Sequence, residues 1–149
     1  MQKIVLFIAI FTVLIATGCQ EKAKPEAITK NKCEIKITEA SSFALSQYKG
    51  YLNLTLDIKN SFEKEVLYVV IEYSYIDKYE TKYFSERAKV TEVTSGKRKI
   101  NLLEEHNSVS DFLYRRVPSE ENAGRAFLAK GLKIKVIGVA FKDGNKVLF

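Results

Sequence analysis

The chain has 149 residues, of which 46% are hydrophobic and 28% are charged, with two cysteines and no tryptophan. This composition suits one globular domain with an ordinary core and excludes an intrinsically disordered chain. The formal net charge is +6, but residues 33–149 carry only +3 of it, which argues against a nucleic-acid-binding domain with a concentrated basic face.

The first 18 residues have the features of a secretory signal peptide. Lys3 precedes an unbroken apolar run over residues 4–16, and the small residues Thr17 and Gly18 follow it. As a helix this run would span about 20 Å, whereas the hydrocarbon core of a bilayer is about 30 Å thick. Residues 1–18 are therefore interpreted as a cleaved signal helix, and a permanent transmembrane span is the weaker alternative.

The sequence Ala16-Thr17-Gly18-Cys19 resembles the lipobox of bacterial lipoproteins. In that family the cysteine is acylated and becomes the new N-terminus, so the resemblance implies that Cys19 is the lipid anchor. Two or three acyl chains hold a protein stably on a membrane. In a host with two membranes, Gln20 after the cysteine implies the outer membrane, facing the periplasm. The alternative is an ordinary cleaved signal peptide with Cys19 near the cut by chance.

Residues 19–32 are polar and show no apolar period, and they include four lysines and Pro25. We interpret them as a flexible tether that would hold the domain roughly 20 Å from the membrane. Because Cys19 would be acylated, Cys33 is then the remaining thiol. It is expected to pack as a small hydrophobe, with an intermolecular disulfide as the alternative.

Residues 33–149 show the alternation of polar and apolar residues that is typical of strands. The clearest case is residues 51–59, where every second residue from Leu52 to Ile58 is apolar. Residues 66–76 are largely apolar on both faces, which predicts either a central strand or an exposed aromatic surface. Further strands are predicted over residues 33–38, 82–86, 87–94, 97–103, 132–142 and 146–149, and residues 41–50 are mixed.

Residues 104–125 break this alternation and predict an irregular segment. A short helix is predicted near its end, with Ser119 as the N-cap and Gly131 as the C-terminal stop. Its apolar face would consist of Ala123, Ala126 and Phe127.

The last predicted strands contain a conflict of faces. Ile137, Val139 and Phe141 share the parity of two polar positions, Lys133 and Lys135. Either the solvated face of this strand becomes apolar, or a β-bulge at Gly138 exchanges the two faces. The Asp143-Gly144 pair that follows predicts a type I′ hairpin turn.

Many short strands separated by turns, with one short helix, predict an all-β fold, an antiparallel β-sandwich. Residues 51–77 resemble the second and third strands of immunoglobulin-like modules in bacterial lipoproteins, the FxLYD-type domains of unknown function, and the Thr-Ser-Gly-Lys sequence at 94–97 fits a turn common in that family. The Phe-x-Leu-Tyr-Asp signature itself is absent, and Phe112-Leu113-Tyr114 is not its equivalent. The resemblance therefore implies an immunoglobulin-like fold for residues 33–149 and no functional residue.

Catalytic and metal-binding motifs are sparse. His106 is the only histidine, and no Gly-x-Ser-x-Gly elbow accompanies it or the nearby Ser108 and Ser110. It lacks a second histidine or clustered thiolates for zinc, and Glu104 with Glu105 is too little to predict a cation site. We therefore expect an exposed loop histidine, no catalytic residue, no metal site and no cofactor.

Tyrosine provides the positive signal for function. Tyrosine favours interfaces because its ring is apolar and its tip is polar, although in a sandwich it also packs in the core or in cross-strand pairs. Five of the eight tyrosines have no obvious place in the core and are candidate partner-binding residues: Tyr73, Tyr75, Tyr79, Tyr83 and Tyr114.

The leading hypothesis is an envelope lipoprotein, anchored to the membrane by acyl chains on Cys19, whose sandwich binds another envelope protein as an accessory factor. The candidate tyrosines and residues 104–125 would form the contact, without catalysis and without nucleic acid. One alternative is an inhibitor or immunity-type lipoprotein that blocks an incoming enzyme. The other is an envelope hydrolase that uses a pair of carboxylates, of which the sequence singles out none.

Overall fold

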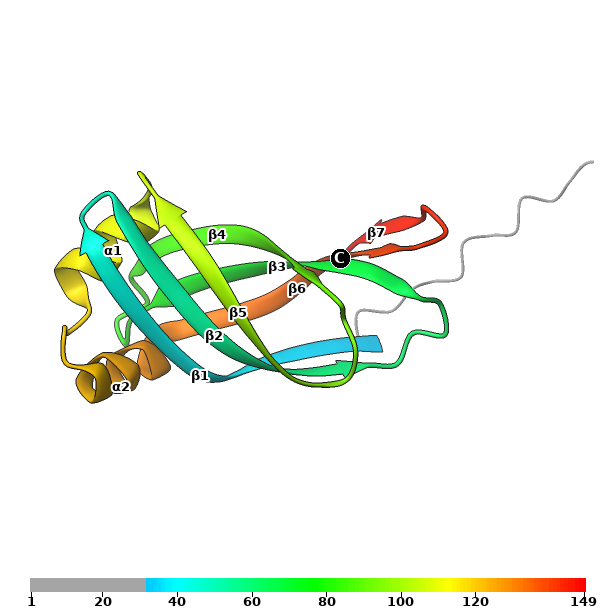
Figure 1. Ribbon diagram of the computed structural model, residues 1–149, viewed down its shortest axis with the longest axis horizontal. Coiled ribbons are helices and arrows are strands. Elements are labelled where there is room, and N and C mark those ends of the chain that lie inside the picture. Colours follow the sequence, from blue (N-terminus) through cyan, green and yellow to red (C-terminus); the bar gives the residue numbers. More distant parts are fainter. Residues whose placement is uncertain (1–31) are drawn as a thin grey trace, which may run out of the picture.

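Two antiparallel sheets pack face to face in the computed structural model, which describes residues 32–149 (Figure 1). One sheet has the strand order β1-β2-β5 and the other β4-β3-β6-β7. The elements are β1 (Cys33–Ser46), β2 (Lys49–Asn60), β3 (Val66–Ile76), β4 (Lys82–Thr91), β5 (Gly96–Glu105), α1 (Ser108–Arg116), α2 (Glu121–Gly131), β6 (Leu132–Phe141) and β7 (Lys146–Leu148). The predicted all-β sandwich is confirmed.

The strand order is that of an immunoglobulin-like domain. When the strands are lettered A, B, C, C′, E, F and G in chain order, the sheets read A-B-E and C′-C-F-G. Both helices lie in the connection between E and F, which is β5 to β6 here. In Figure 1, α1 and α2 lie at one end of the sandwich, and β1 begins at the opposite end.

The core follows from the alternation in β2. Leu52, Leu54, Leu56 and Ile58 are fully buried between the sheets, while the residues between them face outward. Each such burial contributes about 1.5–3 kcal/mol. Cys33 also lies in the core, as expected for a thiol that packs as a small hydrophobe, and this burial raises its pKa.

A β-bulge resolves the conflict of faces in β6. Val136 pairs with Ile71 and Gly138 pairs with Val70, so Ile137 is an extra residue without a partner in β3. The faces therefore exchange, and Val139 and Phe141 point into the core like Val136. The same ladder shows that β3 is a central strand, because it is hydrogen-bonded to β4 on one side and to β6 on the other.

Several predicted boundaries were wrong. Residues 33–46 form one strand, and residues 82–91 form one strand instead of two, because pairing with β2 and with β3 continues through the positions of mixed polarity. Residues 104–125 are not irregular, since they contain α1. Asn107 caps this helix by accepting a hydrogen bond from the Ser110 backbone N–H, and the Ser110 hydroxyl accepts one from the Asn107 backbone N–H.

The predicted second helix exists, with a different cap and a different buried face. Its N-cap is Glu120, without a side-chain cap, and its buried residues are Gly124, Leu128 and Gly131. Spacings of four and three residues place these on one helix face. Ala123 and Ala126 are exposed, and Phe127 is half-buried.

The hairpin between β6 and β7 is not a type I′ turn. That type needs positive φ at both central residues, and among the residues at 142–145 only Gly144 has it, with φ 90°. The Gly144 N–H donates to the Phe141 carbonyl, and the Phe141 N–H donates to the Asn145 carbonyl. These bonds define a type I turn followed by a glycine bulge.

The predictions for residues 1–18 and for Cys19 lie outside the described residues, as does the tether up to residue 31. Across residues 32–149, neither helix has the length and apolar character needed to cross a membrane.

Candidate functional site

Three of the candidate tyrosines line one cleft at the helical end of the sandwich. This cleft lies where the β3–β4 turn meets α1 and α2, and its volume is about 360 Å³, within the lower range of ligand sites. We call it the aromatic cleft. It is lined by Tyr75, Asp77, Lys78, Tyr79, Tyr83, Phe112, Arg115, Arg116 and Phe127.

The floor of the aromatic cleft is a set of packed rings. Tyr75 stacks on Phe127 with ring centroids 5.3 Å apart and an interplanar angle of 7°, and Phe112 lies 4.6 Å from Tyr75. The Tyr75 hydroxyl donates a hydrogen bond of 3.3 Å to the Phe127 carbonyl. Tyr83 completes the floor with its ring 5.4 Å from Phe112. Such contacts fix the rings before any ligand arrives.

Gly131 allows this packing because it has no side chain. A Cβ at this position would lie 2.6 Å from the Tyr75 Cζ and 2.6 Å from the Ile76 carbonyl oxygen. The sequence predicted Gly131 as a glycine stop beyond the helix, but Gly131 is the last residue of α2, it does not have the positive φ of such a stop, and the C-cap is Leu132. The structure gives a different reason for glycine, which is the close approach of the Tyr75 ring.

The β3–β4 turn is organised by the Asp77 carboxylate. Its Oδ1 accepts hydrogen bonds from the backbone N–H groups of Tyr79 (2.8 Å) and Thr81 (2.9 Å), and its Oδ2 accepts one from the Tyr83 hydroxyl (3.1 Å). Desolvation raises the pKa of Asp77, but these hydrogen bonds outweigh it and hold the pKa below the ordinary 3.8. The bond to Asp77 raises the pKa of Tyr83, so its hydroxyl stays protonated.

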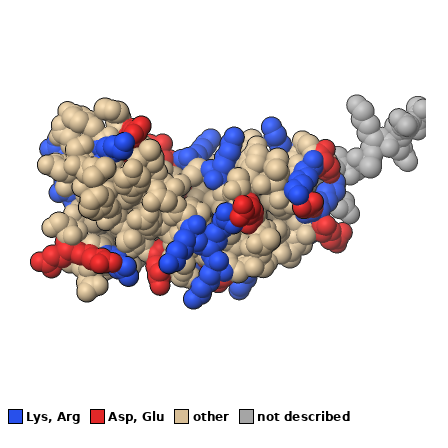
Figure 2. Space-filling view, viewed as in Figure 1, with Lys and Arg blue, Asp and Glu red and all other residues tan. Residues whose placement is uncertain are grey.

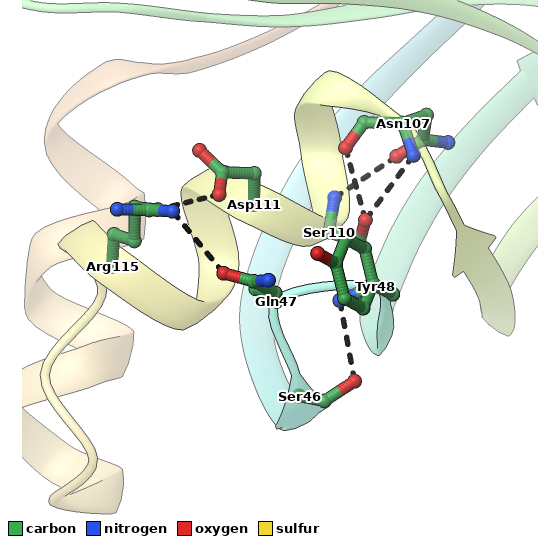
Figure 3. A network of polar contacts seen from close by, with 7 residues as sticks. All are labelled: Ser46, Gln47, Tyr48, Asn107, Ser110, Asp111 and Arg115. Carbon is green, nitrogen blue, oxygen red and sulfur yellow. Dashed lines mark hydrogen bonds and ion pairs between the residues drawn. The ribbon is translucent and has the colours of Figure 1, made fainter.

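Cationic side chains form the rim of the aromatic cleft. The Arg116 guanidinium lies 5.6 Å from the centroid of the Tyr83 ring, and Lys78 Nζ lies 4.8 Å from that of Tyr79. Arg115 is held from two sides, by Asp111 at 2.5 Å and by Gln47 of the β1–β2 turn at 3.2 Å (Figure 3). The cleft therefore has a fixed apolar floor and a largely positive rim.

The structure separates the five candidate tyrosines. Tyr75, Tyr79 and Tyr83 line the aromatic cleft, with Tyr75 buried in the floor, Tyr83 half-buried and Tyr79 at the rim with 75% of its surface exposed. Tyr114 is 55% exposed on α1 and does not line the cleft.

The interpretation of Tyr73 as a partner-binding residue was wrong. It is only 3% exposed, because it shares the inward parity of Val69 and Ile71 in β3. Its hydroxyl donates a 2.5 Å hydrogen bond to Oε1 of Glu104, which is also buried. Burial, and then this bond, raise the pKa of Tyr73 far above its ordinary value.

Sequence reasoning assigned residues 104–125 to the contact as a segment without singling out Phe112, Arg115 or Arg116, and it did not assign Phe127. Phe112 and the arginines belong to α1, whose signals are the Asn107 cap and the helical spacing of Val109, Phe112 and Leu113. A helix of nine residues gives only a short apolar pattern. Because residues 104–125 also lack strand alternation, they were predicted to be irregular.

The residues considered for catalysis have structural roles. His106 is exposed and stacks on Tyr48 with centroids 5.5 Å apart, as expected for a loop histidine. Ser110 belongs to the cap of α1, and the described hydrogen bonds connect His106 to neither serine. Glu105 pairs with Lys49 on the surface, while Glu104 accepts a second bond from the Asn107 amide at 2.8 Å.

Over residues 32–149, no group of three or more His, Cys, Asp or Glu side chains is placed to hold a metal ion. Comparisons of the chain with protein-family models, curated proteins and solved structures found no match. The resemblance to FxLYD-type domains stays a prediction, and the functional argument depends on the geometry of this chain.

Proposed function

We propose that this chain is a lipid-anchored envelope lipoprotein whose sandwich binds another envelope protein in the aromatic cleft. The signal-like residues 1–18 and the lipobox resemblance at Cys19 support the anchor. The observation that carries the binding role is the cleft itself, in which packed aromatic rings lie under a cationic rim. Aromatic residues and arginine are the side chains most enriched at protein interfaces and at their energetic hot spots.

The position of the aromatic cleft supports this role. In Figure 1, β1 begins at one end of the sandwich, and α1 and α2 lie at the other. The aromatic cleft lies beside these helices, because Phe112 of α1 and Phe127 of α2 line it. A domain tethered through residues 19–32 would thus present the cleft away from its attachment point. A partner could reach the cleft without displacing the tether.

The charges around the aromatic cleft indicate the chemistry of the partner. Lys78, Arg115 and Arg116 line the cleft together with the Asp77 carboxylate, and Arg115 is paired with Asp111 beside it, so Lys78 and Arg116 are the cations of the rim without a described ion pair. Complementarity therefore favours an acidic segment with an aromatic or aliphatic side chain that inserts between the rings. The single carboxylate also supports binding over the hydrolase alternative, since glycoside hydrolysis uses two.

A photo-crosslinking experiment tests the binding role. p-Benzoylphenylalanine replaces Tyr79 at the rim of the aromatic cleft in one strain and Tyr68, on the outer face of the other end of β3, in a control strain. Irradiation of cells should give a discrete crosslinked protein from position 79 only. Arg116→Glu should weaken that complex by about tenfold or more, because it places like charges at the rim. Equal crosslinking from both positions would count against the cleft.

The anchor is tested separately. Cys19→Ser should give a precursor that takes up no radiolabelled palmitate and is released from membranes by washing. If Cys19→Ser fractionates with membranes and carries label as the natural chain does, the anchor assignment is refuted.

A further inference from the structure

Strand β5 is an open edge of its sheet. Across residues 32–149 it pairs with β2 on one side, and no described strand pairs with its other side. An open edge presents unpaired backbone N–H and C=O groups to any strand that approaches it. Whether another strand can use these groups depends on the regularity of the edge and on its side chains.

The edge formed by β5 is the most regular one in the described part of the sandwich. Over residues 96–105 its register against β2 has no shift. The other edge strands are interrupted or short: β1 has extra residues at 38 and 45, β4 has an extra residue at 83, and β7 has three residues. Bulges and short strands protect an edge from pairing, and β5 has neither of these features.

The open backbone groups of β5 belong to every second residue. The His106 N–H donates to the Tyr48 carbonyl at 2.8 Å, one residue beyond the last β2–β5 pair and in the same register. In an antiparallel ladder the backbone groups of successive residues point alternately to the two sides. The even-numbered residues of β5 therefore bond β2. The odd-numbered residues point their backbone groups to the open edge, and these are Lys97, Lys99, Asn101, Leu103 and Glu105.

Charge is distributed unevenly along this edge. The five odd-numbered side chains are exposed, with Lys97 and Lys99 near the start of β5 and Glu105 at its end. In Figure 2, seen from the same side as Figure 1, Lys and Arg side chains gather over the middle of this face, where β5 begins, and few lie toward the helical end. A second β5 strand that runs in the opposite direction would therefore bring its acidic end to the basic end of the first.

One antiparallel register of two β5 strands uses the whole edge. When the pair is centred on Asn101, Lys97 of each copy lies opposite Glu105 of the other. Lys99 lies opposite Leu103, and the two Asn101 residues face each other. All five odd-numbered residues are then in hydrogen-bonded pairs, which gives about ten backbone hydrogen bonds. A pair centred on Lys99 would instead place the two copies of that lysine opposite each other.

The ion pairs within the chain are compatible with this register. Glu105 pairs with Lys49 at 3.1 Å on the surface, and Lys97 has no ion pair among residues 32–149. Lys97 lies beside Asp57 in the β2–β5 register. One row across the pair would thus read Lys49 and Glu105 from one copy, then Lys97 and Asp57 from the other. The charges alternate in sign along this row, and opposite charges on neighbouring strands stabilise a sheet.

A second copy would also cover the inner face of β5. Ile100 and Leu102 are half-buried, whereas their cross-strand neighbours Leu54 and Leu52 are 1% and 0% exposed. The difference arises because β2 has a strand on each side and β5 has one on a single side. In the pair centred on Asn101, Ile100 of each copy faces Leu102 of the other, so both side chains lose apolar surface to solvent.

The centre of the register is compatible with two-fold symmetry. Asn101 Nδ2 donates to Asn53 Oδ1 at 2.6 Å. A primary amide has a second N–H and an acceptor oxygen, and neither takes part in that bond. The amides of two Asn101 residues that face each other can therefore exchange hydrogen bonds while each one keeps its bond to Asn53.

We infer that two copies of this chain form a symmetric dimer in which β5 pairs with β5. The two β1-β2-β5 sheets then join into one continuous sheet. A second copy fits this edge better than an unrelated strand, because each end of β5 complements its other end. β5 contributes no lining residue to the aromatic cleft, so this inference does not depend on the proposed protein partner.

Disulfide trapping on the purified full chain in detergent tests the pairing. Opposite Cα atoms in a hydrogen-bonded antiparallel pair lie about 5.5 Å apart, which a disulfide can span. Asn101→Cys, at the two-fold axis, should therefore give a disulfide-linked dimer under mild oxidation.

Asn53→Cys is the matched control for this trapping. It is the same substitution in the same cross-strand row, but it lies on β2, so its counterpart in the second copy is three strand spacings, about 14 Å, away. Both variants keep Cys19 and Cys33, so disulfides through these thiols would appear equally in both. An Asn101→Cys chain that stays monomeric would leave the edge to a strand of another protein and overturn the inference. A dimer yield from Asn53→Cys as high as that from Asn101→Cys would overturn it as well.

Two charge reversals test the register. Lys97→Glu and Glu105→Lys, each combined with Asn101→Cys, place like charges at both ends of the pair. Each should lower the yield of disulfide-linked dimer about tenfold. A mixture of the two variants, marked with different affinity tags, should restore the yield as a mixed dimer, because one variant is acidic at both ends of β5 and the other is basic.

Recovery in the mixture would also show that both variants are folded. If either variant alone forms the dimer as well as Asn101→Cys does, or if the mixture forms no mixed dimer, the register and the proposed dimer are refuted.

Discussion

Removal of the Tyr73 hydroxyl tests the buried network that supports α1. Glu104 is 4% exposed, and its two oxygens accept one bond each, from the Tyr73 hydroxyl (2.5 Å) and the Asn107 amide (2.8 Å). Tyr73→Phe would leave Oε1 of a buried carboxylate without a partner. A hydrogen bond to a charged group contributes about 1.5–3 kcal/mol, and the unsatisfied oxygen adds to the loss.

We therefore expect Tyr73→Phe to lower the free energy of unfolding by about 2–3 kcal/mol. For a domain of this size each kcal/mol lowers Tm by roughly 4 °C, so the shift is about 8–12 °C. Urea unfolding followed by circular dichroism measures the free energy, and a thermal melt measures Tm. Because Asn107 caps α1 and contacts Glu104, the variant should also loosen the helix that carries Phe112 and the two arginines of the cleft.

Tyr83→Phe provides a matched control. It removes the same atom, but the Asp77 carboxylate that would lose its bond keeps two backbone partners and is only half-buried. Its cost should be clearly smaller than that of Tyr73→Phe. A Tyr73→Phe variant as stable as Tyr83→Phe would refute the view that the Glu104 network is a buried, hydrogen-bonded support for α1.

Two further predictions concern the floor and the turn of the aromatic cleft. Gly131→Ala should cost about 1–3 kcal/mol in urea unfolding and change the near-ultraviolet dichroism of Tyr75, because the added Cβ overlaps the ring; an unchanged spectrum would contradict the packing. The Asp77 pKa is lowered on folding, so its stabilising effect is complete above its unfolded pKa near 3.8 and is lost as pH falls through the lower folded value. Amide exchange at Tyr79 and Thr81 should rise in that acid range, and Asp77→Asn should remove the pH dependence; if the variant keeps it, another group is responsible.

The fold could be predicted where one physical rule dominated. In β2 every second residue is apolar, and a strand with one buried face is the structure that satisfies that pattern. The face conflict in residues 132–141 also had a local signature, since Lys133 and Lys135 share parity with residues that must be buried. The sequence was compatible with an apolar outer face or with a β-bulge, and the pairing of Gly138 with Val70 shows that the bulge forms.

Where several rules competed, the sequence was insufficient. Tyr73 and Tyr75 have the same parity and chemistry, yet one bonds a buried carboxylate and the other forms the floor of a cleft. The difference comes from Glu104 and Phe127, which lie 31 and 52 residues away in sequence. No local pattern encodes such contacts.

Helix α2 contributes Phe127 to the floor of the aromatic cleft. Leu128, which is fully buried, fixes α2 against the sandwich. Leu128→Ala should destabilise the domain by about 2–5 kcal/mol and let α2 shift into the space that the side chain leaves.

This variant tests whether α2 positions the floor of the aromatic cleft. Leu128→Ala should weaken the crosslink from position 79, although it replaces no residue that lines the cleft. The assay would be run well below the measured Tm of the variant, so that the domain is folded. If Leu128→Ala leaves the crosslink at the natural level, α2 does not position the cleft, and the contribution of Phe127 to it must be rejected.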